Sequence, residues 1–513
     1  MFETNFSSLD WGIVAVYLAV VAIVGMLVNR YIHNVDDYLV GGRGSGTALN
    51  TATFIGTGLG LVTIMYAAMD GFQHGFSYMT LGLIGMVVGV GLGLSGFVIT
   101  RLREAKLLTI PEFFHTRYSP RVRIVAGSIC ALAGILNMGL FPKMGATFLT
   151  YATGLGQGDA AAASQETTIN IVTSILIVLV LAYTVLGGMV SVIVTDYLQF
   201  VILSTGLGFG LYFCLTNPEL GWDRMVGALE EHRGERAFNP VHKDSYGGIW
   251  VIWMTVHFAV AALCWAPEVS RALTAKDPTA TKRTFLFGAP GQFIRLAIPA
   301  LLAIAAFCYI SQHVELGKYF FPEGLSGKAA HPDQAMPLVL GKIVPTGLLG
   351  ILVAGLMAAF MSTHDSYFLC WSSVIARDVV APMKKRELSD REQIRITRIA
   401  IVCIGIFLLV WGIWYELPDS VWGYMAVTGN IYMCGAIVGL VGGMYWKGAS
   451  SAGAMAALLG GLLSVTLIFL PKEWQARTDV NAALSLGNYA VCVALFVVFS
   501  LLFPDKRRTE EGA

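Results

Sequence analysis

The chain has 513 residues, of which 56% are hydrophobic and 13% are charged, and its formal net charge at pH 7 is +1. A soluble domain of this length would carry about 25% charged residues, so the composition excludes an ordinary soluble protein. All eight cysteines lie within apolar runs, and no disulfide framework is predicted. The net charge by itself identifies no partner. We expect the lipid bilayer as surroundings, no nucleic-acid partner and no obligate protein partner.

Apolar runs of 18 or more residues recur along the whole chain, and each predicts a transmembrane helix. The first run, 11–27, has no basic segment before it, so we expect a retained helix rather than a cleaved signal peptide. Thirteen spans are predicted, at residues 10–29, 46–69, 76–100, 124–153, 169–187, 189–215, 247–273, 284–311, 346–375, 396–415, 419–445, 450–470 and 484–503.

Basic residues gather in a few of the segments between the predicted spans, namely "RLREAK" (101–106), "TRYSPRVR" (116–123), "KKRELSDREQIRITR" (384–398) and "DKRR" (505–508). All of these segments lie on one side of the membrane if the N-terminus is outside. Cytoplasmic segments carry an excess of Lys and Arg. The pattern predicts a multi-pass protein of the plasma membrane, of the bacterial inner membrane in particular, with a cytoplasmic C-terminus.

Several enzyme and pump motifs are absent from the sequence. There is no Gly-x-x-x-x-Gly-Lys-Ser/Thr stretch to hold a nucleotide, which argues against an ATP-driven pump. His and Cys do not cluster at metal-ligand spacing, and no Gly-x-Ser-x-Gly nucleophile elbow occurs. We therefore expect that the protein is not an enzyme.

Three glycines fall on alternate positions of the second predicted span, in "ATFIGTGLGLVT" (52–63). Glycine costs about 1 kcal/mol per helix position, so Gly56, Gly58 and Gly60 favour an unwound stretch. Carbonyls freed there must bind protein, water or a cation, because lipid offers no partner. A tight seam between packed helices is the alternative interpretation.

A second interruption follows five spans later, in "CWAPEVSRAL" (264–273). Pro267 removes a helix hydrogen bond and predicts a kink, and Glu268 lies next to it. Two broken helices in corresponding positions of two halves indicate the binding site of a secondary transporter. Alternatively, Glu268 lies near the inner membrane surface, since Arg271 follows closely.

The most polar stretch within an apolar span is "AAFMSTHDSYF" (358–368). Residues three and four apart share a helix face, so Ala359, Ser362, Thr363 and Ser366 lie together with Asp365 beside them. Grouped oxygen atoms suit a small hard cation. A carboxylate at membrane depth is costly and indicates function, although a structural ion pair remains an alternative for Asp365.

Two basic residues also lie inside apolar runs. Lys143 occurs in "GLFPKMGA" and Arg295 in "FIRLAIP". Either side chain is suited to bind an anionic substrate or to neutralise Glu268, Asp196 or Asp365. Arg295 is also able to reach the inner membrane interface with its long side chain.

Four segments in their order and spacing carry a family resemblance: "YLVGGRGSG" (38–46), "TIPEFFHTRYS" (109–119), "TDYLQF" (195–200) and "LLGILVAGLMAAFMST" (348–363). From about residue 10 to 503 the chain resembles the sodium/solute symporter family, whose relatives include carriers of galactose, proline, pantothenate and sialic acid.

The resemblance implies an all-α polytopic membrane protein with the inverted-repeat, five-plus-five LeuT-type fold. The whole chain, 1–513, is then one transporter domain. The resemblance places an extra N-terminal helix at 10–29, the first repeat at 46–215, the second at 247–445, and two C-terminal helices at 450–503.

The resemblance also implies a main sodium site, with Na⁺ as the coupling ion. Two backbone carbonyls of the unwound first core helix fall on Gly56 and Leu59. The remaining ligands are the carbonyl of Ala359 and the hydroxyls of Ser362 and Thr363.

Some relatives hold a second sodium, and the matching positions here are Asp196, Asp365 and Ser366. Relatives carry a small polar residue in place of Asp365. This carboxyl is therefore expected to tighten a second cation, to carry a proton or to pair with Lys143.

Substrate contacts carry over poorly from the family, because "WAPEVSRAL" departs from the usual pattern of the sixth core helix. Thr63 matches a substrate-facing position of the sugar carrier. The substrate candidates are Thr63, Lys143, Trp265, Glu268 and Arg295.

Together these features predict sodium-coupled symport of a small organic solute by alternating access. A proton-coupled carrier on the same fold is the first alternative, with Asp365 or Glu268 as the proton site. A solute sensor that does not transport is the second, although the tail "PDKRRTEEGA" holds no signalling domain. The sequence does not identify the solute.

Overall fold

The structure is a computed structural model, and it describes residues 3–28, 46–107, 109–156, 162–321, 330–384, 386, 388–418, 420–471, 474 and 477–505. Helices make up most of these residues. The motif at 38–46 lies largely outside the described residues, as does most of the basic tail at 505–508.

In chain order the α-helices are α1 (Ser8–Val28), α3 (Thr47–Gly58), α4 (Leu61–His74), α5 (Met79–Ser95), α6 (Ile99–Glu104), α7 (Ile110–Arg117), α8 (Pro120–Asn137), α9 (Phe141–Thr153), α10 (Ala162–Thr216), α11 (Trp222–Arg233), α12 (Gly248–Cys264), α13 (Ala266–Thr274), α14 (Pro278–Gln312), α15 (Val314–Phe320), α16 (Ala335–Ile343), α17 (Leu348–Val374), α18 (Ala381–Met383), α19 (Asp390–Trp414), α20 (Val421–Tyr445), α21 (Ser451–Gly461) and α23 (Thr478–Leu502). Short 3₁₀ segments are η3 (Gly75–Tyr78), η4 (Met138–Leu140), η5 (Gly234–Ala237), η6 (Pro332–Gln334) and η8 (Leu462–Phe469), and η7 (Ile375–Val380) is a π-helix.

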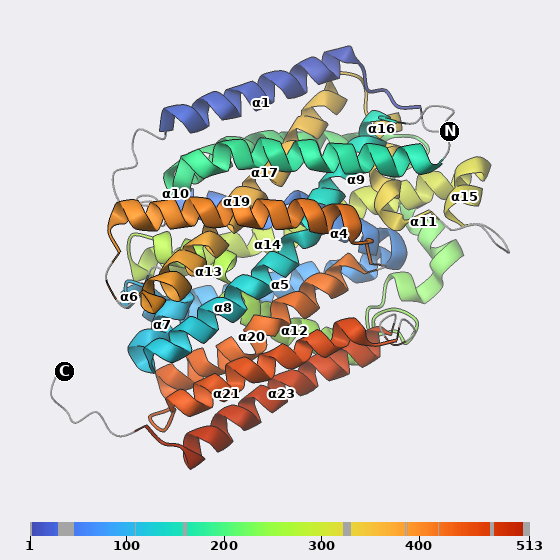
Figure 1. The fold of residues 1–513 in the computed structure, drawn as a ribbon. Coiled ribbons are helices and arrows are strands. Elements are labelled where there is room, and N and C mark those ends of the chain that lie inside the picture. Colours follow the sequence, from blue (N-terminus) through green and yellow to red (C-terminus); the bar gives the residue numbers. More distant parts are fainter. Residues whose placement is uncertain are drawn as a thin grey trace.

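Most of the long helices run along a common direction and form one bundle (Figure 1). At one side α1 packs on α10 and α17, and at the opposite side α21 and α23 pack on each other and on α20. The start of α1 and the end of α23 lie at opposite ends of the bundle (Figure 1).

The predicted all-helical membrane architecture is confirmed. Within the described residues, nine helical segments are long and apolar enough to cross a bilayer, and three shorter apolar helices accompany them. Each of the thirteen predicted ranges overlaps at least one helix. The number thirteen itself stays a prediction.

The helix α17 lies at the centre of the bundle. In the apolar 18-residue stretch of the segment Leu348–Met383, 89% of the residues are buried inside the protein, against 33% in that of Thr478–Leu502 at the edge. A helix that is covered on all sides has no lipid-facing surface, so its polar residues face protein. The polar run 358–368 therefore lies in the core of the molecule.

The helical segment α10 turns back on itself beside α17. Thr184 in its first part contacts Asp365, and Asp196 in its second part contacts Ser362. On a straight helix the twelve residues from Thr184 to Asp196 would cover about 18 Å, whereas Ser362 and Asp365 lie about 4.5 Å apart along α17. Two parts of α10 therefore pack side by side against α17, in agreement with the two spans predicted there.

Both predicted interruptions are present. The first separates α3 from α4 at Leu59 (φ −97°, ψ 47°) and Gly60 (φ −72°, ψ 158°). The second separates α12 from α13 at Trp265, which has an extended backbone (φ −74°, ψ 116°). Pro267 lies in the first turn of α13, where its missing N–H costs no helix hydrogen bond.

Candidate ion and solute sites

The polar run of α17 meets α10 through two carboxylates. Ser362 donates a hydrogen bond of 2.5 Å from Oγ to Oδ1 of Asp196, and Asp365 accepts one from the hydroxyl of Thr184. Asp196 is 1% exposed and Asp365 is fully buried. Two carboxyl groups and several hydroxyls therefore share one buried contact between helices.

The first helix break lies against the same face of α17. A Cβ built on Gly60 would lie 2.0 Å from Oγ1 of Thr363, so the backbone of the break touches this hydroxyl. A Cβ built on Gly56 would lie 3.7 Å from Phe200 and 4.0 Å from the carbonyl oxygen of Asp196. Only glycine at position 60 allows the break to approach α17 this closely.

The predicted carbonyl ligands differ in their hydrogen bonds. Helix α3 continues through Gly56, whose carbonyl accepts the N–H of Leu59 at 3.2 Å. Leu59 lies in the break itself, before the first hydrogen bond of α4, which joins the N–H of Ile64 to the carbonyl of Gly60. The unwound stretch is thus shorter than 52–63. Only Leu59 and Gly60 lie between the two helices, and they are enough to change the direction of the chain.

Several oxygen atoms lie in this region. The carbonyl of Ala359 accepts the hydroxyl of Thr363 at 2.9 Å, which keeps this side chain beside the break. Oxygen has two lone pairs, so the hydroxyls of Ser362 and Thr363 can donate their protons and still bind a cation. Hard cations prefer oxygen ligands of this kind. Of the predicted ligands, Thr363 contacts both Ala359 and Gly60, the neighbour of Leu59, while Ser362 contacts Asp196.

A cavity of about 120 Å³ lies between the two broken helices. It is lined by Phe54, Gly58, Val62, Thr63, Tyr66, Gly85, Val88, Gly89, Asn137, His257, Phe258, Ala261, Ala262, Trp265, Pro267, Glu268, Phe285, Gln292, Arg295, Thr363, Tyr367, Trp422, Met425, Ala426, Gly429 and Met433. Four substrate candidates are in this set: Thr63, Trp265, Glu268 and Arg295. The fifth, Lys143, is not, and its Nζ donates to the carbonyl of Tyr415 at 3.0 Å.

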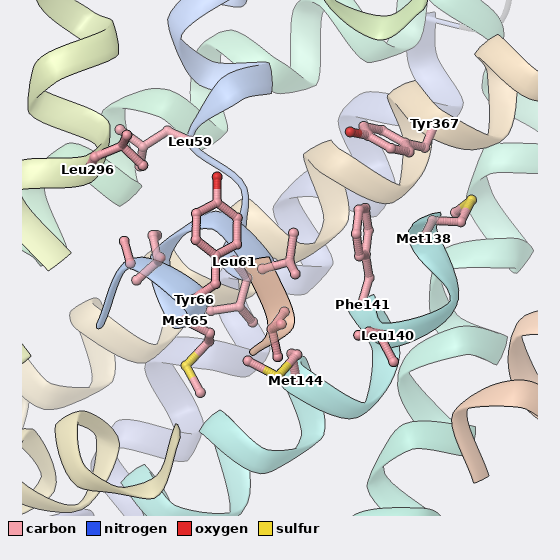
Figure 2. Close-up of a cluster of buried hydrophobic side chains, with 14 of the residues drawn as sticks. Leu59, Leu61, Met65, Tyr66, Met138, Leu140, Phe141, Met144, Leu296 and Tyr367 are labelled. Atoms are coloured by element: carbon pink, nitrogen blue, oxygen red, sulfur yellow. The ribbon is translucent and has the colours of Figure 1, made fainter. Parts of the chain in front are cut away.

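Aromatic side chains from several helices reach the region of the cavity. Figure 2 shows Tyr66 near Leu59 and Leu296, and Tyr367 beside Phe141. The indole N–H of Trp265 donates to the hydroxyl of Tyr367 at 3.3 Å. Residues at the helix breaks and on α17 therefore share the same wall.

The two charged side chains of the cavity pair with each other. Nη1 of Arg295 lies 3.4 Å from Oε1 of Glu268 and 3.3 Å from the carbonyl oxygen of Gly58. One guanidinium on α14 thus joins the end of α3 to the first turn of α13. Of the partners considered for Arg295, Glu268 is the one that it contacts.

Several polar cavity residues were not predicted from the sequence, above all Asn137, His257 and Gln292. A single amide or imidazole in an apolar span is a weak signal, because it is more often a satisfied core residue. In the described part of the chain, no group of three or more His, Cys, Asp and Glu side chains is arranged to hold a metal ion.

The sequence profile of the sodium:solute symporter family matches residues 38–461. This range includes both helix breaks and the polar run. The chain belongs to the sodium:solute symporter family.

Family relatives match along most of their length. The sodium/sialic acid symporter SiaT of Proteus mirabilis is 23% identical over 516 residues, which cover 98% of this chain and 97% of the relative. The sodium/pantothenate symporter of Haemophilus influenzae is 26% identical, with 84% of each chain covered. The high-affinity proline transporter PutP of Bacillus subtilis is 24% identical, with 87% of this chain and 89% of the relative covered.

Solved structures share the fold. A Na⁺-coupled sialic acid symporter in a substrate-bound outward-open state has a TM-score of 0.75 at 18% identity, covering 97% of this chain and 98% of its own. A closed transporter of the nucleobase-cation-symport-1 family has a TM-score of 0.52 at 12% identity, covering 92% and 96%. At these identities the likeness concerns the fold.

Membership in the sodium:solute symporter family confirms the family resemblance, the function of sodium-coupled symport and the role of Na⁺. The symporter is a multi-pass membrane protein and belongs to a family of transporters. The individual ligand residues, the repeat boundaries and the orientation stay predictions.

Proposed function

We propose that this symporter moves a small organic solute through the cavity between the broken helices by alternating access. The observation that carries the proposal is the position of Thr363. Its hydroxyl lies against the break at Gly60, and the same residue lines the cavity. An ion held there would touch the wall of the solute site, so ion binding and solute binding would act on the same residue.

In this proposal sodium binds between the break and α17. The carbonyls of Leu59 and Ala359 and the hydroxyls of Ser362 and Thr363 are the ligands, with the carbonyl of Gly56 as the fifth. All five are uncharged. Neutral oxygen ligands make a site weak enough to release sodium on the low-concentration side. Sodium favours the conformation that completes the cavity, because a ligand shifts an equilibrium toward the state that it binds more tightly.

A second cation would bind one turn further along α17, at Asp196, Asp365 and Ser366. The contacts of Ser362 with Asp196 and of Asp365 with Thr184 support this position. A proton on Asp365 in place of the second sodium is the alternative that the same contacts allow.

The proposed symporter lies in the plasma membrane, in the inner membrane of a bacterium, with its N-terminus outside and its C-terminus in the cytoplasm. The distribution of basic segments supports this orientation. The repeats would comprise 46–215 and 247–445, and each repeat begins with one of the two broken helices. Extra helices at 10–29 and 450–503 flank them in a single domain.

Uptake by the purified symporter in proteoliposomes tests the proposal. An inward sodium gradient should concentrate the labelled solute inside the vesicles. An inside-negative potential should increase the driving force for uptake by about 2.3 kcal/mol per 100 mV for each coupled charge. Uptake driven by an acid outer medium in the absence of sodium would favour the proton-coupled alternative. Binding without any accumulation would favour a sensor.

A further inference from the structure

The charge of the solute can be inferred from the ion pair in the cavity wall. Glu268 and Arg295 are the charged carboxylate and guanidinium among its lining residues, and they lie 3.4 Å apart. Their side chains are 21% and 11% exposed. A charged solute would have to separate this pair or enter without a counter-ion, and a buried charge without a partner is strongly unfavourable.

Arg295 also contacts the backbone. Its Nη1 contacts the carbonyl of Gly58 at the C-terminal end of α3, which carries the negative end of the helix dipole. A Cβ on Gly58 would lie 2.5 Å from the same nitrogen, so the guanidinium fills the space beside this turn. The protein's own cation therefore occupies the place where a cationic group of a solute would otherwise be attracted.

Cavity-lining residues also carry buried polar atoms that no protein group satisfies among the described residues: the oxygens of Asn137 and Gln292 as acceptors, and Nε of Arg295 as a donor. Asn137 is 3% exposed, and its Nδ2 donates to the carbonyl of Met425 at 2.8 Å and to Oγ1 of Thr428 at 3.0 Å. These two bonds fix the orientation of the amide. Its Oδ1 is buried and has no hydrogen-bond partner among the described residues. Buried polar atoms are almost always paired, so this atom indicates a missing partner.

A second acceptor of this kind comes from another helix. Oε1 of Gln292 is buried without a partner in the described part of the chain. Gln292 lies on α14, whereas Asn137 is the last residue of α8. Gln292 faces Gly85 of α5, whereas Asn137 contacts α20. The two amides thus belong to separate walls of the cavity, and both offer an oxygen to a hydrogen-bond donor.

His257 adds a third acceptor. Its Nδ1 lies 3.3 Å from Oδ1 of Asn430, which also accepts the hydroxyl of Tyr489 at 3.0 Å. Because this oxygen accepts, Nδ1 carries the proton, and a neutral ring then has an acceptor at Nε2. The unpaired oxygens of Asn137 and Gln292 call for O–H or N–H groups on the solute, and the unpaired Nε of Arg295 calls for an acceptor such as a hydroxyl or carbonyl oxygen.

Aromatic rings form a further part of the wall. The rings of Tyr66 and Trp422 lie 4.9 Å apart, and Phe258 stacks on Trp422 at 5.9 Å. On the other side Trp265 and Tyr367 lie 6.4 Å apart. Such rings present flat apolar surface together with a few polar atoms.

We propose that the solute is uncharged, has an apolar face and carries O–H or N–H donors at two or more positions, which bind Asn137 and Gln292. This inference rests on the proposed function, in which the cavity is the solute site. A neutral polyol and a neutral heterocyclic amide both have this chemistry.

Thermal stability of the purified full-length symporter in sodium chloride tests the inference with two charge-matched series. The first series is D-glucose, D-glucuronate and D-glucosamine, and the second is nicotinamide, nicotinate and 3-pyridylmethylamine. At least one uncharged compound should raise the melting temperature, and its charged counterparts should not. A shift produced by a charged compound but not by its uncharged counterpart overturns the inference, and so does the absence of any shift from both uncharged compounds.

A variant then tests the acceptor. Gln292→Leu should weaken binding of the stabilising compound about tenfold, as expected for the loss of one buried hydrogen bond. The matched control is Gln312→Leu, on the same helix but outside the cavity lining. Unchanged binding in Gln292→Leu would also overturn the inference.

The sodium dependence of the shift separates this inference from the proposed function. If a charged compound binds and requires sodium, the sodium-coupled site stands and the inference fails. If an uncharged compound binds equally well in potassium chloride, the inference stands and the proposed coupling between the two sites fails.

Discussion

Ser362 on α17 donates a 2.5 Å hydrogen bond to Asp196 on α10, and both residues are buried. The bond holds the hydroxyl oxygen at a fixed place and leaves its lone pairs available. It also links the proposed main sodium site to the proposed second cation site. A change at either residue is therefore expected to affect both ions.

The buried carboxyl of Asp365 should determine the coupling. Asp365→Asn removes one negative charge beside Asp196, so it should reduce the number of cations moved per solute or remove the pH dependence of uptake. Charge movement per solute in proteoliposomes, measured at several pH values, checks this. An Asp365→Asn variant with the original stoichiometry and the original pH profile would identify Asp365 as a structural residue.

A second buried acid provides the control for that variant. Asp378 is fully buried in the π-helix η7, which follows α17, and pairs with Arg123 at 2.8 Å, away from the proposed ion sites. Asp378→Asn should lower the thermal stability, because a buried cation loses its charged partner. It should leave the coupling stoichiometry unchanged.

The close approach at the helix break should not tolerate a side chain. Gly60→Ala would place a methyl group 2.0 Å from Oγ1 of Thr363, so the break or α17 has to shift. Transport should fall at least tenfold, because a displacement of about 1 Å at a site can cost a factor of about 100. Gly91→Ala is the control, since no atom lies within 4 Å of its Cβ position. Equal transport by both variants would contradict the described packing.

The pair of Arg295 and Glu268 should show strong coupling in a double-mutant cycle. Arg295→Gln or Glu268→Gln alone leaves one charge without its partner in the cavity wall, and each should lower the melting temperature. The double variant should recover part of the loss, with a coupling energy of about 0.5–3 kcal/mol. Additive effects of the two substitutions on stability would show that the pair contributes no stabilising interaction.

Some of this architecture follows directly from the sequence. Long apolar runs predict the spans, because a bilayer requires about 20 apolar residues per helix. Glycines at alternate positions and Pro267 mark the two helix breaks, since both residue types weaken helices. The polar run at 358–368 is conspicuous because polar and charged side chains are costly, and therefore rare, within membrane spans.

Other features depend on contacts between distant residues and leave no local signal. The sequence does not show that Arg295 pairs with Glu268 rather than with Asp196, because the partner depends on the rotation of three helices. The position of Lys143 outside the cavity has the same cause. Asn137 and Gln292 resemble ordinary core amides until their neighbours are known. The length of the break at Leu59 is likewise set by packing against Thr363.

In the proposed sodium site, hydroxyls of α17 and carbonyls of the helix break bind the ion together. A sodium titration of the purified symporter, followed by thermal stability, compares the wild type with the double variant Ser362→Ala/Thr363→Ala. The control is Ser373→Ala, whose hydroxyl bonds to the carbonyl of Cys370 on the same helix. We predict that the double variant needs about tenfold more sodium or more for half-maximal stabilisation, because two oxygen ligands are lost. An unchanged sodium midpoint in a folded double variant would contradict this site.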